Sequence, residues 1–157
     1  FALAAVEVAE EGREFGVDID RVYPRSQSVM RDYFTENEQS AMCCEDPVEQ
    51  ARRVTAFWCV KEAILKALKK GLSVSADRVE VLSMGPKDEV TASYDPELGK
   101  GKLRVRCWHL ADYVLTWAVL SLDEDAGIDP TRPFPSTYWS PNITSNNAGV
   151  VLKVVGS

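Results

Sequence analysis

Histidine is scarce in this 157-residue sequence, and glycine-rich phosphate-binding loops are absent. His109, the only histidine, follows Trp108 at a predicted turn, so no Ser/His/Asp or Cys/His catalytic arrangement can be built around it. Neither G-x-G-x-x-G nor a Walker loop occurs, which excludes the two familiar nucleotide-binding motifs. No apolar run is long enough to span a bilayer. We therefore expect a cytoplasmic protein with no membrane partner.

The cysteine positions do not match the spacing of a zinc site. Cys43 and Cys44 are adjacent, Cys59 stands in the middle of a predicted helix, and Cys107 lies in a predicted strand. This spacing favours reduced thiols over a metal site or a disulfide framework. The remaining composition is ordinary for a globular chain, with 45% hydrophobic and 27% charged residues, enough for one domain with a substantial core.

Charge is distributed unevenly along the chain. The net charge is −6, yet residues 51–70 carry six basic side chains and a single acidic one, Glu62. A basic segment in an acidic protein indicates a localised anionic ligand or partner, whereas nucleic-acid binding favours a broader positive surface. A solvated helix face with lysines near its C-terminal end would explain the same pattern equally well.

The stretch from Asp46 to Ser73 predicts one long helix. Asp46 suits the N-cap, Pro47 the first helical position, and Glu49 a capping box, while Gly71 stands where a C-terminal cap belongs. Apolar residues recur at helical spacing and predict a buried stripe, made of Val54, Phe57, Val60, Ile64 and Leu68.

A second face of this helix carries polar chemistry. Glu62 and Lys66 are four residues apart and therefore neighbours on the helix surface. Trp58 lies one turn before Glu62 on the same side. The helix is thus expected to present a carboxylate, a lysine and an indole together.

The rest of the chain predicts strands around this helix. Alternating residues and turn signals predict a first hairpin, made of Phe1–Val8 and Phe15–Val22. Four antiparallel strands are predicted after the long helix, at Arg78–Met84, Glu89–Tyr94, Lys102–Trp108 and Tyr113–Leu120. Two short helices are predicted between Ser28 and Cys44, the second opened by a capping box of Thr35 and Glu38. The expected fold class is α+β, a long helix packed on a small antiparallel sheet. Residues 1–121 are expected to form one domain, followed by an irregular tail over 122–157.

Asp18 and Asp20 lie two residues apart in a predicted strand, so their side chains share one face. Paired carboxylates suit a hard cation such as Mg²⁺. A polar strand face at the surface explains D-x-D just as simply. Glu62 favours the functional interpretation, because it adds a third carboxylate on a lysine-rich helix. Carboxylates for a metal beside lysines for phosphates are what phosphoryl-group transfer requires.

Three motifs together resemble a known family. They are Gly16-Val17-Asp18-Ile19-Asp20, then Phe34-Thr35-x-x-Glu38, then Trp58-x-x-Lys61-Glu62-Ala63-x-x-Lys66, with Lys70-Gly71-Leu72 following. In order and separation they resemble the 4′-phosphopantetheinyl transferases over roughly residues 1–120. The tryptophan that begins the third motif is similar to the large surfactin-synthetase type rather than the short holo-carrier-synthase type.

The resemblance implies an activity and a site. Such enzymes move the phosphopantetheine arm of coenzyme A onto a serine of an acyl or peptidyl carrier protein and release adenosine 3′,5′-bisphosphate. It implies that Asp18, Asp20 and Glu62 hold Mg²⁺, and that Glu62 is also a candidate base for the serine hydroxyl. Lys66 matches a phosphate-contacting catalytic lysine, and coenzyme A contacts are also expected from Lys61 and Lys70. Glu38 matches a family position at the metal site, and Asp20 stands where relatives often carry Glu.

One departure affects the expected assembly. The large type is a pseudo-dimer of two similar halves, and the chain begins at a strand resembling the one that follows the Ser-His motif of the first half. We therefore expect that half to have been removed, to come from another chain, or to be replaced by self-association. Fusion to a polyketide or fatty-acid megasynthase would also explain this start.

Two other functions remain compatible with the residues. A degenerate half could act as a non-catalytic module that binds carrier proteins or coenzyme A, although the intact third motif argues against degeneration. The carboxylates alone would also suit an Mg²⁺-dependent phosphodiesterase. No nucleic-acid partner is expected.

Overall fold

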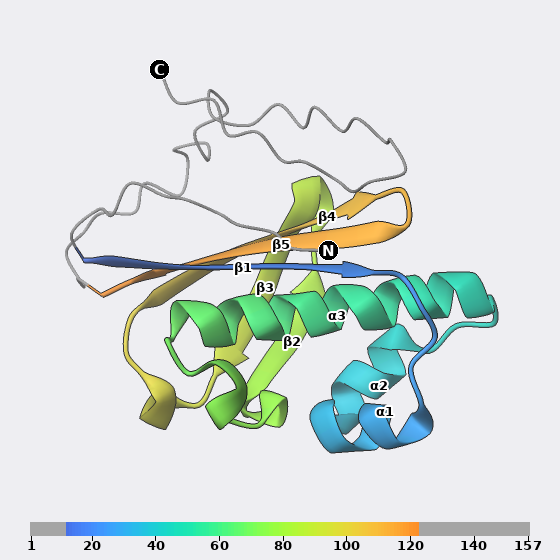
Figure 1. Ribbon diagram of the computed structural model, residues 1–157, viewed down its shortest axis with the longest axis horizontal. Helices are drawn as coiled ribbons and strands as arrows, with labels where there is room; N and C mark the ends of the chain where they lie inside the picture. Colours follow the sequence, from blue (N-terminus) through green and yellow to red (C-terminus); the bar gives the residue numbers. More distant parts are fainter. Residues whose placement is uncertain (1–11, 123–157) are drawn as a thin grey trace. The chain divides into compact units, whose positions relative to one another are not determined.

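The computed structural model describes residues 12–122 (Figure 1). In this part of the chain, helices and strands follow one another as β1 Arg13–Arg21, α1 Gln27–Tyr33, α2 Glu36–Met42, α3 Pro47–Ala67, β2 Val79–Met84, β3 Glu89–Tyr94, β4 Lys102–Leu110 and β5 Tyr113–Ser121. The predicted α+β class is confirmed, and each of the four strands expected after the long helix is present. The predicted strand at Phe1–Val8 and the predicted tail lie outside the described residues.

The strands form a five-stranded antiparallel sheet in the order β1-β5-β4-β3-β2. β1 pairs with β5 along its whole length, so Asp18 lies opposite Thr116 and Asp20 opposite Val114. The first strand of the described chain is therefore tied to the last one. Figure 1 shows α3 running alongside β1 and β5, with α1 and α2 gathered beside the N-terminal half of α3.

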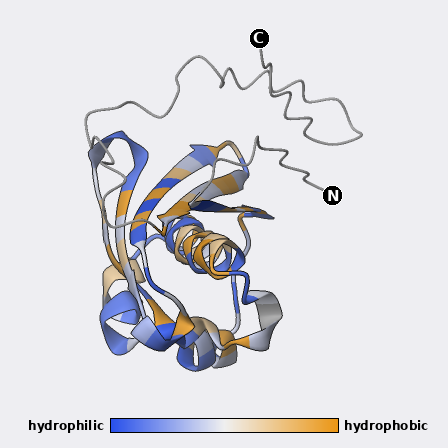
Figure 2. Cartoon of the chain, turned by 90° about the vertical axis from the view of Figure 1, so that its left-hand side faces the viewer, coloured by the Kyte–Doolittle hydropathy of each residue, from blue (hydrophilic) through white to orange (hydrophobic). Residues whose placement is uncertain are grey.

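The core lies between α3 and the sheet. Every member of the predicted stripe is buried, and Val60 and Ile64 are completely so. Figure 2, which looks along α3, shows the sheet curving over the helix. Thr35 and Glu38 form the predicted capping box of α2, and the four cysteines are free thiols. Among the described residues, no helix combines the length and the apolar character that a bilayer crossing requires.

Both ends of α3 differ in detail from the prediction. Asp46 accepts from the Val48 amide as an N-cap, but Glu49 pairs with Arg53 at 3.0 Å instead of closing a capping box. The helix ends at Ala67, and two residues beyond it adopt the left-handed conformation, Lys69 with a φ of 57° and Gly71 with a φ of 49°. The amide of Lys69 donates to Lys66 and that of Lys70 to Leu65, which satisfies two of the last carbonyls.

Candidate functional site

Gly16 sets the distance between β1 and α3. A Cβ atom at this position would lie 1.9 Å from the carbonyl oxygen of Ala63, so the strand can approach the helix backbone only because residue 16 has no side chain. Side chains alternate along a strand, so Asp18 and Asp20 are on the same face as Gly16 and point toward α3. Their side chains are only 14% and 29% exposed. The aspartates thus belong to the helix–strand junction, not to a solvent-facing strand surface.

Asp18 is paired with Lys66 of α3. The Lys66 ammonium donates to Asp18 Oδ1 at 2.8 Å and to the Val17 carbonyl at 3.0 Å. Lys66 is 45% exposed, so this cation is held at the rim of the junction. Beneath the pair, burial together with the negative charge of Asp18 raises the pKa of the Cys59 thiol, which therefore stays protonated. The two residues singled out from separate motifs are in direct contact.

Asp20 is paired with Arg25, a residue that the sequence motifs did not identify. Arg25 Nη2 donates to Asp20 Oδ2 at 2.5 Å, and its Nη1 donates to the Tyr23 hydroxyl at 2.8 Å. The guanidinium carbon also lies 4.6 Å from the centre of the Trp58 ring. Arg25 lies in an irregular segment between β1 and α1. Such a segment has neither helical nor strand periodicity, so the direction of its side chains cannot be predicted from the sequence.

Glu62 faces the same group from α3. Burial raises the pKa of this carboxyl, and Asp18 raises it further, while Lys66 and Arg25 act in the opposite direction. Glu62 is therefore within electrostatic reach of all three. The site contains three carboxylates, those of Asp18, Asp20 and Glu62, and two cations, Lys66 and Arg25. Its formal charge is therefore −1. Such a cluster attracts a further cation.

The chemistry of these donors fits Mg²⁺, which prefers carboxylate oxygens and takes its other ligands from water and phosphate. In the arrangement that the structure shows, however, Asp18 and Asp20 are each turned to a basic side chain. Within residues 12–122, no three acidic, histidine or cysteine side chains converge tightly enough to hold a metal ion as they stand. The three carboxylates lie at the same helix–strand junction, but their oxygens do not converge on one metal position.

Lys61 lies apart from this cluster, and the structure gives no support to its predicted contact with coenzyme A. Its side chain is completely buried and pairs with Glu38 at 2.7 Å. The ammonium also donates to three carbonyl oxygens, those of Tyr33, Ala76 and Val79. Burial lowers the pKa of Lys61, and the Glu38 carboxylate opposes that effect. A cation enclosed in this way has no face left for a phosphate.

Glu38 is equally occupied. Besides Lys61, it accepts from the amides of Thr35 and Val81, and its side chain is fully buried. This arrangement likewise gives no support to its expected place at the metal site. The Lys61–Glu38 pair instead joins α2, α3 and β2 inside the core. Lys70, the other expected coenzyme A contact, follows the end of α3, where its neighbour Lys69 pairs with Glu14 at 2.6 Å.

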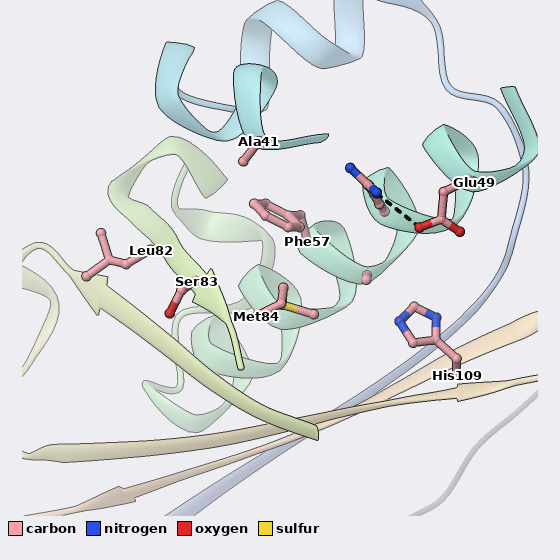
Figure 3. Close-up of a pocket in the computed structure, with 9 residues that line it drawn as sticks. Ala41, Glu49, Phe57, Leu82, Ser83, Met84 and His109 are labelled. Atoms are coloured by element: carbon pink, nitrogen blue, oxygen red, sulfur yellow. Dashed lines mark hydrogen bonds and ion pairs between the residues drawn. The ribbon is translucent and has the colours of Figure 1, made fainter. Parts of the chain in front are cut away.

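A pocket lies elsewhere on the molecule (Figure 3). It has a volume of about 330 Å³ and is lined by Ala41, Glu49, Arg53, Ala56, Phe57, Leu82, Ser83, Met84 and His109. Arg53 and Glu62 are nine residues apart, which is roughly half a turn around the helix axis, so this hollow opens on the opposite side of α3. His109 lies in β4 rather than in the predicted turn, and it lines this pocket.

Comparison with known proteins identifies the family. The model of the 4′-phosphopantetheinyl transferase superfamily matches residues 14–118, which is well over half of the chain. The chain belongs to this superfamily. The matched region contains all three of the sequence motifs and both ion pairs of the junction.

Two curated relatives come from Bacillus subtilis. 4′-Phosphopantetheinyl transferase Sfp of strain 168 is 30% identical over 73 residues, which cover 46% of this chain and 33% of Sfp. A second 4′-phosphopantetheinyl transferase is 27% identical over 73 residues, with the same coverage of 46% and 33%. The match thus spans about a third of the length of these relatives.

Solved structures share the fold. The holo-(acyl-carrier-protein) synthase of Bacillus anthracis, in complex with CoA (3′,5′-ADP), has a TM-score of 0.57 at 18% identity and covers 70% of this chain and 96% of its own. The Chronobacterium ammoniagenes ACPS–CoA complex has a TM-score of 0.58 at 19% identity, covering 72% and 99%. The Thermotoga maritima synthase has a TM-score of 0.58 at 20% identity, covering 70% and 64%. At these identities the likeness establishes the fold alone.

Proposed function

We propose that this chain is a 4′-phosphopantetheinyl transferase that moves the 4′-phosphopantetheine arm of coenzyme A to a serine of an acyl or peptidyl carrier protein. Adenosine 3′,5′-bisphosphate is the other product. The observation that carries the proposal is the meeting of Asp18, Asp20, Glu62 and Lys66 at one helix–strand junction in a member of this superfamily. Two motifs far apart in the sequence supply these four side chains, Gly16–Asp20 and Trp58–Lys66.

In this proposal Asp18, Asp20 and Glu62 hold Mg²⁺, which supplies positive charge for the pyrophosphate of coenzyme A when it is bound. Lys66 is the mobile cation of the site. Its side chain is 45% exposed and flexible, and its ammonium is bound to Asp18, so it is free to exchange that carboxylate for a phosphate oxygen. Positioning and charge stabilisation provide most of the rate enhancement in such transfers.

Glu62 has the properties of a general base. Burial raises the pKa of its carboxyl, so the ionised form is a better proton acceptor than an exposed glutamate. In the proposed step the serine oxygen attacks the phosphorus next to pantetheine and loses its proton to Glu62, directly or through water. The bond from that phosphorus to the bridging oxygen breaks, and the bisphosphate leaves with the electron pair.

The finer assignments also belong to this proposal. Similarity to Sfp over 73 residues supports the surfactin-synthetase type, and the family match to 14–118 supports a transferase domain over residues 1–121. The adenine and 3′-phosphate contacts would come from a companion half, in the same or another chain, or from a second copy. A place within a polyketide or fatty-acid megasynthase, and in the cytoplasm, fits this activity.

The alternative is a non-catalytic module that binds coenzyme A or a carrier protein, and the pairing of both aspartates with basic side chains favours it.

Incubation with coenzyme A, Mg²⁺ and an apo carrier protein, followed by mass spectrometry of the carrier, distinguishes the enzyme from the binding module. The chain is assayed alone at high concentration and together with a companion half. Transfer that disappears in EDTA supports the enzyme, whereas binding without transfer in every combination supports the module.

A further inference from the structure

We propose that Arg25 is a positioning residue of this site, which holds the Asp20 carboxylate in a fixed orientation while Tyr23 and Trp58 clamp the guanidinium. The inference rests on the proposed function, because it takes Asp20 as a metal ligand. It goes beyond that function by giving a role to a residue outside the three motifs and by explaining what Trp58 does.

The environment of Arg25 is unusual for a charged side chain. Only 6% of the side chain is exposed, and the guanidinium carbon lies 4.6 Å from the ring centres of both Tyr23 and Trp58. Its Nε is buried and makes no hydrogen bond. A buried donor without a partner costs stability, so this side chain is not placed for packing alone. Two cation–π contacts and the ion pair with Asp20 hold it where it is.

The effect on Asp20 follows from the hydrogen bonds. Oδ2 accepts from Arg25, and Oδ1 accepts from the Arg21 amide at 2.8 Å. Each oxygen thus has one partner and keeps a second lone pair. The carboxylate is fixed in orientation yet still able to bind a cation. Ligating carboxylates are commonly oriented by such outer partners, and loss of the partner weakens metal binding.

Asp18 provides the contrast within the same site. Its partner Lys66 is 45% exposed and therefore able to move away, whereas Arg25 is enclosed by two rings. Lys66 is suited to exchange between Asp18 and a phosphate. Arg25 is suited to remain bound to Asp20. The two cations therefore have different roles, although each neutralises one aspartate.

Trp58 connects this clamp to the helix that carries Glu62. Its ring meets the Tyr33 ring edge-on, with centroids 5.3 Å apart, and the Phe34 ring at 6.3 Å. These contacts fix the indole, and the indole in turn fixes Arg25 against α3. Trp58 therefore serves the site by holding Arg25.

The test measures metal affinity, not turnover. Mn²⁺ replaces Mg²⁺ as a spectroscopic probe, and its dissociation constant is measured by electron paramagnetic resonance with and without coenzyme A. Arg25→Gln should bind Mn²⁺ about 10- to 100-fold more weakly than the wild type. Arg78→Gln is the matched control, because Arg78 pairs with Asp95 and Glu97 away from the site and should leave the affinity unchanged.

A rescue experiment separates positioning from general damage. Arg25→Gly leaves space for a guanidinium ion, and millimolar guanidinium, but not ammonium, should restore Mn²⁺ affinity. Unchanged or tighter Mn²⁺ binding by Arg25→Gln overturns the inference, and so does a loss that guanidinium does not restore. If Arg25→Gln fails to fold, Arg25→Gly with guanidinium decides in the same way. Failure of the wild type to bind Mn²⁺ in either condition overturns the metal site itself, and with it the proposed function.

Discussion

The backbone of Gly16 faces the carbonyl of Ala63 so closely that a Cβ atom at residue 16 would come within 1.9 Å of the carbonyl oxygen. This contact sets how near β1 lies to α3. Asp18 and Asp20 follow on the same face of the strand, and Glu62 immediately precedes Ala63 in the helix. The distance between the carboxylates of the site therefore depends on a residue with no functional group.

Gly16→Ala is expected to lower the free energy of unfolding by about 2–3 kcal/mol, at the upper end of the usual cost of overpacking, because the new methyl group meets backbone atoms that cannot yield. Gly85→Ala is the control, since the nearest atom to a Cβ there is 3.3 Å away and the change should be small. The midpoints of urea unfolding measure the stability of both variants, provided that the m-value is unchanged. Equal midpoints for the two variants would contradict the account of this junction.

Lys61→Met tests whether the buried pair is structural. Removing the ammonium leaves Glu38 as an uncompensated charge in the core, so we expect a loss of about 3–5 kcal/mol. Lys100→Met, at an exposed position before β4, should be nearly neutral. Adding Glu38→Gln to Lys61→Met should recover part of the loss, because the stranded charge has gone. Strictly additive losses in the double variant would show that the two residues are not coupled.

Lys66→Ala tests the mobile cation. Loss of one charge-assisted hydrogen bond to phosphate should weaken coenzyme A binding by roughly 10- to 100-fold, with little effect on stability. Lys69→Ala is matched to it, since Lys69 is 70% exposed and paired with Glu14, and it should bind coenzyme A normally. Calorimetric titration with coenzyme A compares them. Equal affinities would remove Lys66 from the phosphate site.

Glu62 predicts a pH dependence of known sign. A carboxyl whose pKa is raised on folding stabilises the fold below its unfolded-state pKa, and this contribution is lost as the pH rises through the folded-state pKa. Relative to Glu62→Gln, the wild type should therefore lose stability as the pH rises through the folded-state pKa of Glu62, above the ordinary range of a glutamate. The opposite sign is expected for Asp95, because the Glu97 amide and Arg78 lower its pKa: relative to Asp95→Asn, the wild type should lose stability as the pH falls below the ordinary range of an aspartate. Urea midpoints measured over both pH ranges test the two signs.

The sequence predicted most of the fold because its local signals agree with one another. Alternation and turn residues located β2 to β5, and helical spacing located the buried face of α3. The same spacing carried a signal about Lys61 that was missed. Phe57 lies four residues before it and Ile64 three residues after it, so Lys61 shares their buried side of the helix. A lysine is usually exposed, and this expectation outweighed the pattern.

Other features of the site and of α3 could not be predicted from local sequence patterns. Arg25 lies in a segment without helical or strand period, and its contact with Trp58 depends on how two distant elements pack. The end of α3 was misplaced because glycine is the usual left-handed residue, whereas here Lys69, two residues before Gly71, already adopts that conformation. The aspartates were recognised as a pair, but their burial against α3 depends on Gly16 and Ala63 together.

The central claim is that this junction performs phosphoryl-group transfer, and steady-state arm transfer by the wild type and Glu62→Gln tests it most directly. Gln preserves the size and helix propensity of Glu but cannot accept a proton. With Mg²⁺, apo carrier protein and a companion half present, the wild type should load the carrier. Glu62→Gln should do so roughly two to four orders of magnitude more slowly, as expected for loss of a general base. Equal rates for the two proteins would contradict the account.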